Sequence, residues 1–218
     1  MKKSLKRIIL LGLILFFGYL VYLNHLVKGA FSSEIQESKK ITQIDYSLER
    51  YPQEMVNMLL LIEDQSFFQH WGVDFIEIVR VVYGYLFEDK AIRGASTITQ
   101  QLIKNTLLSR DKNLSRKINE AFMAMLLELN YDKNYILERY MNTVYFAQQG
   151  SIAIHGFASG SNYYFGKKVE DLDLREMATL VALLKGPSYY HPVKHPDRLN
   201  IRVDMILSMH NNYKKIIQ

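Results

Sequence analysis

Residues 114–131 read Leu-Ser-Arg-Lys-Ile-Asn-Glu-Ala-Phe-Met-Ala-Met-Leu-Leu-Glu-Leu-Asn-Tyr, and this stretch carries the clearest structural signal in the chain. Its apolar residues recur at spacings of three and four, which places them on one side of a helix. They are Ile118, Ala121, Phe122, Met125, Leu126 and Leu129. The stretch therefore predicts an amphipathic helix that packs against a core.

Similar helical patterns lie on both sides of this stretch. We expect helices after Pro52, after Asp74, from Ser96 or Thr97 to about Leu108, over Tyr135–Val144, over Leu174–Lys185, and from near Pro196 onward. Residues 88–95 break the pattern and predict a loop, whereas residues 150–166 are richer in Gly and Ser with a helical middle. Alternating strand patterns are few. The prediction is one mainly α domain at residues 45–218.

The N-terminal region is strongly apolar. Residues 8–27 contain no Asp, Glu, Lys or Arg, and a helix of that length is about 30 Å long, which is enough to cross a bilayer core. Four cations lie in residues 2–7 and predict a cytoplasmic N-terminus. The alternative, a cleaved signal peptide, is disfavoured because the stretch is long and no Ala-x-Ala site follows it. We expect a cytoplasmic tail at residues 1–7, a transmembrane anchor at 8–27 and a juxtamembrane linker at 28–44.

Composition excludes several classes of protein. The 218 residues include no Cys, which rules out a disulfide scaffold, a zinc–thiolate site and a Cys nucleophile. The formal charge is +5, but the N-terminal cations Lys2, Lys3, Lys6 and Arg7 account for four of these charges and leave the rest of the chain at +1. The domain is therefore nearly neutral, and we expect no nucleic-acid partner.

Residues 63–72 read Glu-Asp-Gln-Ser-Phe-Phe-Gln-His-Trp-Gly and follow the apolar run 58–62. A carboxylate that emerges from an apolar wall is suited to act as a general base or acid. Taken alone, two acidic residues at a helix end are more often solvated or capping residues. Both interpretations remain open at this point.

Three more segments carry polar groups of unusual kinds. Residues 94–105 place hydroxyl, amide and ammonium groups on one helix face, which suits a sugar or phosphate ligand as well as a solvated surface. Residues 112–120 gather three cations and Glu120, and Arg116 with Glu120 could form a simple surface ion pair. Residues 133–142 look structural, with apolar core positions and a helix end at Asn142.

Together these four segments resemble the glycosyltransferase domain of the peptidoglycan polymerases, which occurs in monofunctional enzymes and in class A penicillin-binding proteins. The motifs are Glu-Asp-x-x-Phe-x-x-His-x-Gly at 63–72, Gly-x-Ser-Thr-Ile-Thr-Gln-Gln-x-x-Lys-Asn at 94–105, Arg-Lys-x-x-Glu at 116–120 and Lys-x-x-Ile-Leu-x-x-Tyr-x-Asn at 133–142. They occur in family order, and a weaker fifth motif spans 202–209. The departures are Ala95 in place of a frequent Gly, Lys112 in place of a frequent Arg, and Ile201 in place of the first residue of an Arg pair.

The resemblance implies a lysozyme-like helical fold and an enzyme that polymerises lipid II into β-1,4-linked glycan with inversion. In that reaction Glu63 would be the general base, and Glu120 would organise the site or hold Mg²⁺ or Mn²⁺. Cations would stabilise the departing pyrophosphate, with hydroxyl and amide groups beside them. The implied substrate-binding residues are Asp64, Phe67, His70, Ser96, Thr97, Gln100, Gln101, Lys104, Asn105, Lys112, Arg116, Lys117 and Arg202.

The implied partners are lipid II, the growing lipid-linked strand, membrane lipid and other proteins of cell-wall synthesis. The implied location is the cytoplasmic membrane, with the catalytic domain outside, and no transpeptidase half is expected. One rival is a lysozyme-like hydrolase or lytic transglycosylase, which needs no pyrophosphate site. A second rival is a non-catalytic membrane scaffold, which would be expected to lack Glu63, Lys104 or Glu120.

Overall fold

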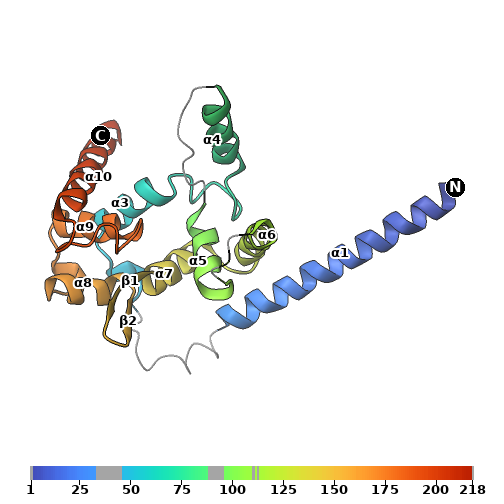
Figure 1. The fold of residues 1–218 in the computed structure, drawn as a ribbon, viewed down its shortest axis with the longest axis horizontal. Coiled ribbons are helices and arrows are strands. Elements are labelled where there is room, and N and C mark those ends of the chain that lie inside the picture. Colours follow the sequence, from blue (N-terminus) through green and yellow to red (C-terminus); the bar gives the residue numbers. More distant parts are fainter. Residues whose placement is uncertain (1, 33–45, 88–95, 110, 112, 218) are drawn as a thin grey trace.

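A computed structural model describes residues 2–32, 46–87, 96–109, 111 and 113–217. In Figure 1 a long helix, α1 (Lys2–Phe31), projects from a body of helices with one small hairpin at its lower edge. The mainly α fold predicted from the sequence is confirmed. The body contains η1 (Leu48–Arg50), α3 (Gln53–Glu63), α4 (Phe75–Phe87), α5 (Ile98–Leu107), α6 (Leu114–Asn130), α7 (Lys133–Thr143), β1 (Tyr145–Gln149), β2 (Ile152–His155), α8 (Phe157–Phe165), η2 (Val169–Asp171), α9 (Leu174–Leu184) and α10 (Pro196–Ile217).

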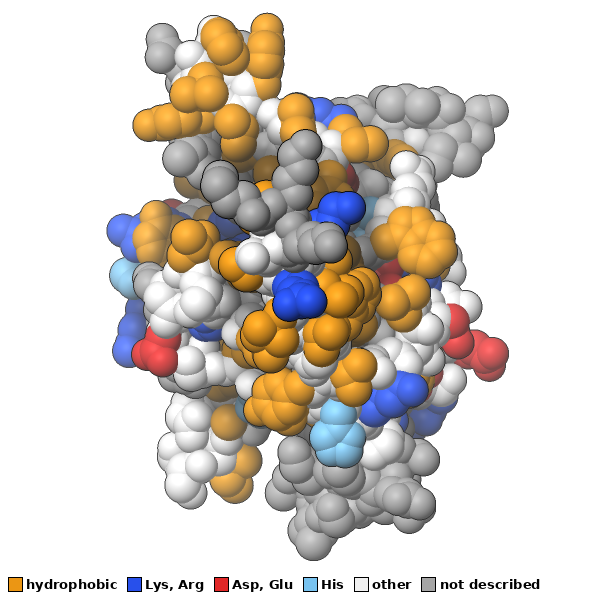
Figure 2. Space-filling model, turned by 90° about the vertical axis from the view of Figure 1, so that its right-hand side faces the viewer, with side chains coloured by type: hydrophobic (Ala, Val, Ile, Leu, Met, Phe, Trp, Pro, Cys, Tyr) orange, Lys and Arg blue, Asp and Glu red, His pale blue; other side chains and the backbone are white. Residues whose placement is uncertain are grey.

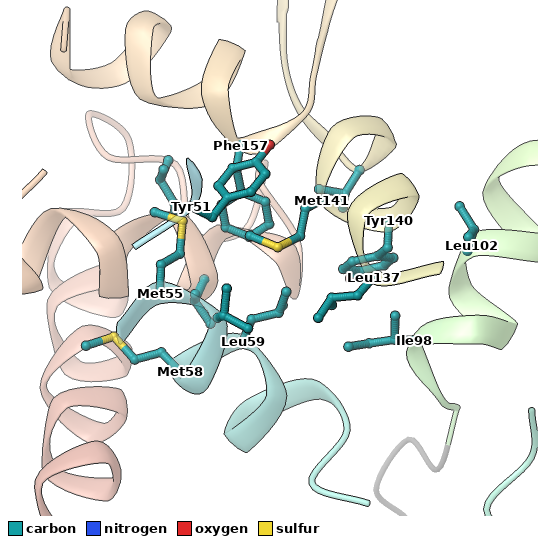
Figure 3. Packing of buried hydrophobic residues seen from close by; sticks show 14 of the residues in the cluster. Tyr51, Met55, Met58, Leu59, Ile98, Leu102, Leu137, Tyr140, Met141 and Phe157 are labelled. Carbon is teal, nitrogen blue, oxygen red and sulfur yellow. The ribbon is translucent and has the colours of Figure 1, made fainter. Parts of the chain in front are cut away.

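The core lies where α3, α5, α7 and α9 meet. Figure 3 shows Met55 and Leu59 from α3 beside Leu137 and Tyr140 from α7, with Ile98 of α5 next to them. All five side chains are buried. Burying large apolar side chains contributes about 1.5–3 kcal/mol each, so this cluster holds the ends of α3 and α5 in fixed positions. The motifs at 63–72 and 94–105 include those helix ends.

Capping residues set where the helices begin. Asn113 accepts a hydrogen bond from the backbone N–H of Arg116 at 2.7 Å and starts α6. Asp132 caps α7 in the same way, which is why α7 begins at Lys133 rather than at the expected Tyr135. A side-chain oxygen at this position satisfies a backbone donor that otherwise has no partner.

The hairpin was not expected from the sequence. Strands β1 and β2 pair antiparallel across a turn at Gly150, in the region where the Gly- and Ser-rich pattern predicted a helical middle. The helical part is α8, which starts only after Gly156. Gly156 has φ +81°, and a Cβ there would lie 2.6 Å from the carbonyl oxygen of Asn142. The chain therefore needs glycine where it leaves the hairpin and enters α8.

Helix α1 extends beyond the predicted span of 8–27 in both directions, and residues 28–31 of the expected linker are helical. By length and composition, its stretch Ser4–Phe31 is suited to cross a membrane. The remainder of the predicted linker, like the predicted loop at 88–95, lies outside the described residues.

The second half of α1 packs against α6. Leu23, Val27 and Phe31 are buried in the core cluster. The Tyr19 hydroxyl donates to Asn119 Oδ1 at 2.8 Å, and Asn130 Nδ2 donates to Asn24 Oδ1 at 2.8 Å. Further toward the N-terminus the apolar side chains of α1 are exposed. Helix α1 therefore has an exposed N-terminal part and a C-terminal part that packs against the domain.

The contact between α1 and α6 can be tested by cross-linking, because the chain contains no Cys of its own. Cysteines at Asn24 and Asn130 are expected to be joined within one chain by a short bismaleimide in membranes. Cysteines at Val21 and Asn130 form the control pair, because Val21 is 69% exposed. Equal cross-linking of both pairs, read as mobility on a denaturing gel, would contradict the packed arrangement.

Candidate catalytic site

Glu63 is the last residue of α3, and its partly buried side chain is held by Gln101. Gln101 Nε2 donates to Glu63 Oε2 at 2.9 Å, and the Tyr140 hydroxyl donates to Gln101 Oε1 at 3.1 Å. Burial raises the pKa of Tyr140 well above its usual value, and the charges of Glu63 and Asp64 raise it further. Tyr140 therefore remains a donor, which fixes the Gln101 amide so that its NH₂ group faces Glu63.

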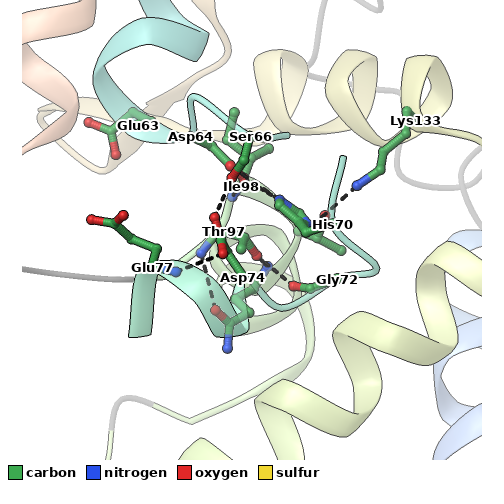
Figure 4. A network of polar contacts seen from close by, with 12 residues as sticks. Glu63, Asp64, Ser66, His70, Gly72, Asp74, Glu77, Thr97, Ile98 and Lys133 are labelled. Carbon is green, nitrogen blue, oxygen red and sulfur yellow. Dashed lines mark hydrogen bonds and ion pairs between the residues drawn. The ribbon is translucent and has the colours of Figure 1, made fainter. Parts of the chain in front are cut away.

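Asp64 follows Glu63 but lies in different surroundings. Its carboxylate accepts a hydrogen bond from the backbone N–H of Ile98 at 2.9 Å and contacts His70 Nε2 at 3.0 Å. Figure 4 shows Asp64 directed into this network, while the Glu63 carboxylate points away from it. Because Asp64 is buried and already hydrogen-bonded, Glu63 is the carboxylate better placed to meet a ligand.

The start of α5 is fixed by hydrogen bonds within the protein. Thr97 caps the helix and forms a reciprocal pair with Gln100, and the Thr97 hydroxyl also donates to the Gly72 carbonyl at 2.7 Å. Both side chains are buried, at 3% and 2% exposure. The shared polar face expected for residues 97–105 is therefore divided: Thr97 and Gln100 order the helix, whereas Lys104 and Asn105 are exposed.

A second group of charges lies at the N-terminal half of α6. Glu120 is 1% exposed, and its two carboxylate oxygens contact Arg116 Nη1 at 2.8 Å and Lys117 Nζ. Lys117 Nζ also donates to the Ser96 hydroxyl at 2.7 Å, just before α5. A buried carboxylate is stable only when it is paired, so Glu120 holds both cations in fixed positions.

The other predicted residues are distributed unevenly. Lys104 is one turn beyond Gln101 on α5 and so lies on the same helix face. Phe67 is buried, and Lys112 lies outside the described residues. Arg202 is held elsewhere, with its Nε donating to the Ala182 carbonyl at 3.2 Å. In the described parts of the chain, no hydrogen bond or ion pair joins Arg202 to the other predicted residues.

Comparisons with known proteins show the family of the chain. The family described as Transglycosylase matches residues 28–211. The chain belongs to the transglycosylase family. It is 39% identical to penicillin-binding protein 1B of Haemophilus influenzae over 169 residues, 78% of this chain and 22% of the relative.

Two further relatives show the same partial coverage. The Vibrio cholerae penicillin-binding protein 1B is 42% identical over 74% of this chain and 21% of its own length. Penicillin-binding protein 1F of Bacillus subtilis is 39% identical over 76% of this chain and 23% of its own length. The chain therefore spans about a fifth of the length of the curated relatives it matches.

The residues of the site can be compared with the needs of a divalent cation. Both Glu120 oxygens already contact cations. Among the described residues, no group of three or more His, Cys, Asp or Glu side chains is arranged to hold a metal ion. Mg²⁺ or Mn²⁺ requires several oxygen ligands, so the described side chains do not fit an ion held by protein alone.

Three residues near the site were not predicted from the sequence. Tyr140 orients Gln101, and Glu128 and Lys133 contact each other and His70. Lys133 and Tyr140 belong to the fourth motif, which was interpreted as structural. Glu128 looked like an ordinary acid near the end of an amphipathic helix. The available signal for Tyr140 was its hydroxyl group, which is a polar group on a helix face that is otherwise apolar.

Gly72 offers a test of how the site is supported. It has φ +80°, and a Cβ there would lie 2.6 Å from the Ala124 backbone. We expect Gly72→Ala to lower the free energy of unfolding by about 1–3 kcal/mol and to displace the carbonyl that Thr97 contacts.

The matched control is Gly150→Ala, which also has positive φ, at +59°, but meets no atom within 4 Å. Chemical denaturation of both variants measures the difference. If Gly150→Ala were as destabilising as Gly72→Ala, the close approach to Ala124 would not be the cause.

Proposed function

We propose that this protein is a peptidoglycan glycosyltransferase that polymerises lipid II into β-1,4-linked glycan strands. The observation that carries the proposal is that α5 joins a partly buried carboxylate to a cation cluster. Its Gln101 contacts Glu63, and Ser96 just before it contacts Lys117, which is paired with Glu120. A base and a site for an anionic leaving group are the two parts that such a transfer requires.

In the proposed reaction Glu63 removes the proton from the 4-hydroxyl group of the acceptor sugar. That oxygen attacks the anomeric carbon of the growing strand, and the bond from this carbon to the pyrophosphate oxygen breaks. The pyrophosphate leaves with the electron pair, so the configuration at carbon inverts without a covalent enzyme intermediate. Arg116, Lys117 and Lys104 stabilise the negative charge that develops on the leaving group.

The roles of the remaining residues follow from their contacts. Asn105, Ser96 and Lys112 are proposed to assist in holding the diphosphate. Glu120 fixes the cations rather than taking part in proton transfer, because both of its oxygens are engaged. Help from Mg²⁺ or Mn²⁺ stays a proposal, and no step above depends on it. Arg202 is the weakest of the proposed substrate contacts, since it packs against Tyr190 and the end of α9.

The apolar surface of α4 supports the proposal that the substrate is bound to the membrane. Its exposed apolar side chains gather at the top of Figure 2, above those of α1 at the centre. They are Phe75, Ile76, Val79, Val82, Tyr83, Tyr85, Leu86 and Phe87. Large contiguous apolar patches mark contact with lipid or protein. We propose that α4 dips into the membrane where the polyprenyl chain enters, with α1 as a single anchor whose N-terminus is cytoplasmic.

The rival functions differ in what they require. A lysozyme-like hydrolase needs a carboxylate but has no use for the Arg116–Glu120–Lys117 cluster, so the cluster favours transfer from a diphosphate. A non-catalytic scaffold has no need for a partly buried Glu63 held by Gln101. Lengthening of labelled lipid II, as opposed to clearing of purified cell wall, distinguishes these functions.

Glu63→Gln is expected to reduce glycan polymerisation by at least about 100-fold while the fold is retained, because the amide cannot accept the proton. Glu49→Gln is the control, since Glu49 is an exposed acid on η1. Both are assayed with labelled lipid II, with and without Mg²⁺. Polymerisation by folded Glu63→Gln at the rate of the unmodified protein would overturn the assignment of the base.

The proposed membrane contact of α4 can be followed with the single tryptophan of the chain, Trp71, which is 71% exposed and precedes α4. Brominated lipids are expected to quench its fluorescence, and a double Ile76→Glu and Val79→Glu change is expected to weaken the quenching. Ile152→Glu, on β2 and 60% exposed, is the control. Quenching that is the same in all three variants would argue against insertion of α4.

A further inference from the structure

His70 lies at the centre of a buried chain of polar groups that the proposed reaction does not use. Its Nε2 is 3.0 Å from Asp64 Oδ2. Its Nδ1 is 3.4 Å from Lys133 Nζ and 3.7 Å from Glu128 Oε1. Lys133 Nζ donates to Glu128 Oε1 at 2.7 Å, and the Thr99 hydroxyl donates to the same oxygen at 2.6 Å.

The chain is shielded from solvent. The side chains of Asp64, His70 and Glu128 are 3%, 5% and 4% exposed, and that of Lys133 is 21% exposed. Charges in such surroundings are costly unless each has a partner, and the loss of one partner leaves the other uncompensated. The four groups come from the end of α3, the segment after it, α6 and α7. They therefore link separate parts of the body (Figure 4).

The contacts determine which ring nitrogen of His70 carries a proton. An ammonium group has only donors, so Nδ1 must accept from Lys133. The distance from Nδ1 to Glu128 is too long for a hydrogen bond. Nε2 faces a carboxylate and must donate to it. A neutral ring with its proton on Nε2 is the form that satisfies both of these neighbours.

We propose that Lys133 and Glu128 are positioning residues for the proposed transfer reaction, holding His70 in its neutral Nε2–H form so that Asp64 stays fixed. Neither residue touches the reacting atoms. This inference rests on the proposed function for the reaction it serves, whereas the state of the His70 ring can be measured without any substrate.

The effect reaches Glu63 by two routes. Asp64 is the next residue along the chain, so the direction of its side chain decides how α3 ends and where Glu63 points. Asp64 also accepts from the N–H of Ile98, which fixes the first turn of α5. Gln101, one turn later, then meets Glu63 at 2.9 Å. If the contact between His70 and Asp64 were lost, the end of α3 and the first turn of α5 would both be held less rigidly.

The charges around His70 give the inference a pH signature. The groups that face the ring are Asp64 after α3, Asp74 before α4, Glu128 on α6 and Lys133 on α7. A proton on Nδ1 would be repelled by Lys133 and attracted by Glu128. Removing the cation therefore makes protonation of the ring easier, and removing the anion makes it harder. Replacing a residue that only fills space would not change how easily the ring is protonated.

The first measurement is the tautomer of His70 by long-range ¹H–¹⁵N NMR of the full chain in detergent, with the signal assigned by its loss in His70→Gln. The unmodified protein is expected to show a neutral Nε2–H ring at pH 8, and Lys133→Met is expected to show a mixture of tautomers. A neutral Nδ1–H ring or a protonated ring in the unmodified protein would overturn the inference.

The second measurement is kcat and KM on labelled lipid II across pH. Lys133→Met is expected to lower kcat by about 10- to 100-fold with little change in KM, as is typical of groups that orient a catalytic residue. The acid side of its pH profile should move to higher pH, whereas that of Glu128→Gln should move to lower pH. Shifts in the same direction, or an unchanged kcat, would contradict the proposal.

The control is Lys167→Met, which removes a lysine from an exposed pair with Glu176 at 2.6 Å. It should change neither kcat nor the profile. Thermal unfolding shows whether each variant is folded, and if Lys133→Met is not, Glu128→Gln and the tautomer of the unmodified protein still decide the question. If the unmodified protein fails to polymerise lipid II while its His70 is neutral with Nε2–H, the proposed function fails and the positioning chain stands.

Discussion

The hydrogen bond from the Ile98 N–H to Asp64 joins the end of α3 to the start of α5, and the arrangement of the site depends on it. A backbone N–H at the start of a helix has no partner within the helix, and a buried carboxylate cannot be left without donors. Each group supplies what the other lacks. Because the bond is buried, the two helix ends cannot move apart without leaving both groups unpaired, and this fixed geometry places Gln101 next to Glu63.

Neighbouring acids in this chain serve different purposes because their surroundings differ. Asp64 and Glu120 are buried and fully engaged, so each organises the groups around it. Glu63 is only partly buried, and Gln101 is its one side-chain donor among the described residues, so in the proposed reaction its other oxygen can meet a substrate hydroxyl. The same carboxylate chemistry thus organises the structure in two places and, in the proposed reaction, supplies the base in a third.

The sequence predicted the helices well because apolar spacing and capping residues act locally. Asp74 was predicted as a helix start, as was either Ser96 or Thr97, and in the structure Asp74 and Thr97 accept hydrogen bonds from the first turns of their helices. The hairpin was missed because β1 and β2 are short and their pairing depends on Gly156, whose need for positive φ comes from contact with Asn142. The partnership of His70 with Glu128 and Lys133 was also missed, since it joins segments that only the fold brings together. Which of the predicted residues touch a ligand stays a prediction, because no ligand contact can be derived from packing alone.

Helix α6 connects the anchor to the cations. Asn119 and Asn130 contact α1, while Arg116 and Glu120 form the ion pair on the same helix. Asn119 directly precedes Glu120 in α6. The hydrogen bond between Tyr19 and Asn119 therefore fixes the height of the paired cations along α1. For a substrate whose diphosphate lies at the membrane surface, an anchor on a loose linker would leave that height undefined. A helix packed on the cation-bearing helix would define it, which gives a reason for Leu23, Val27 and Phe31 at the C-terminal end of α1 to join the core of the domain.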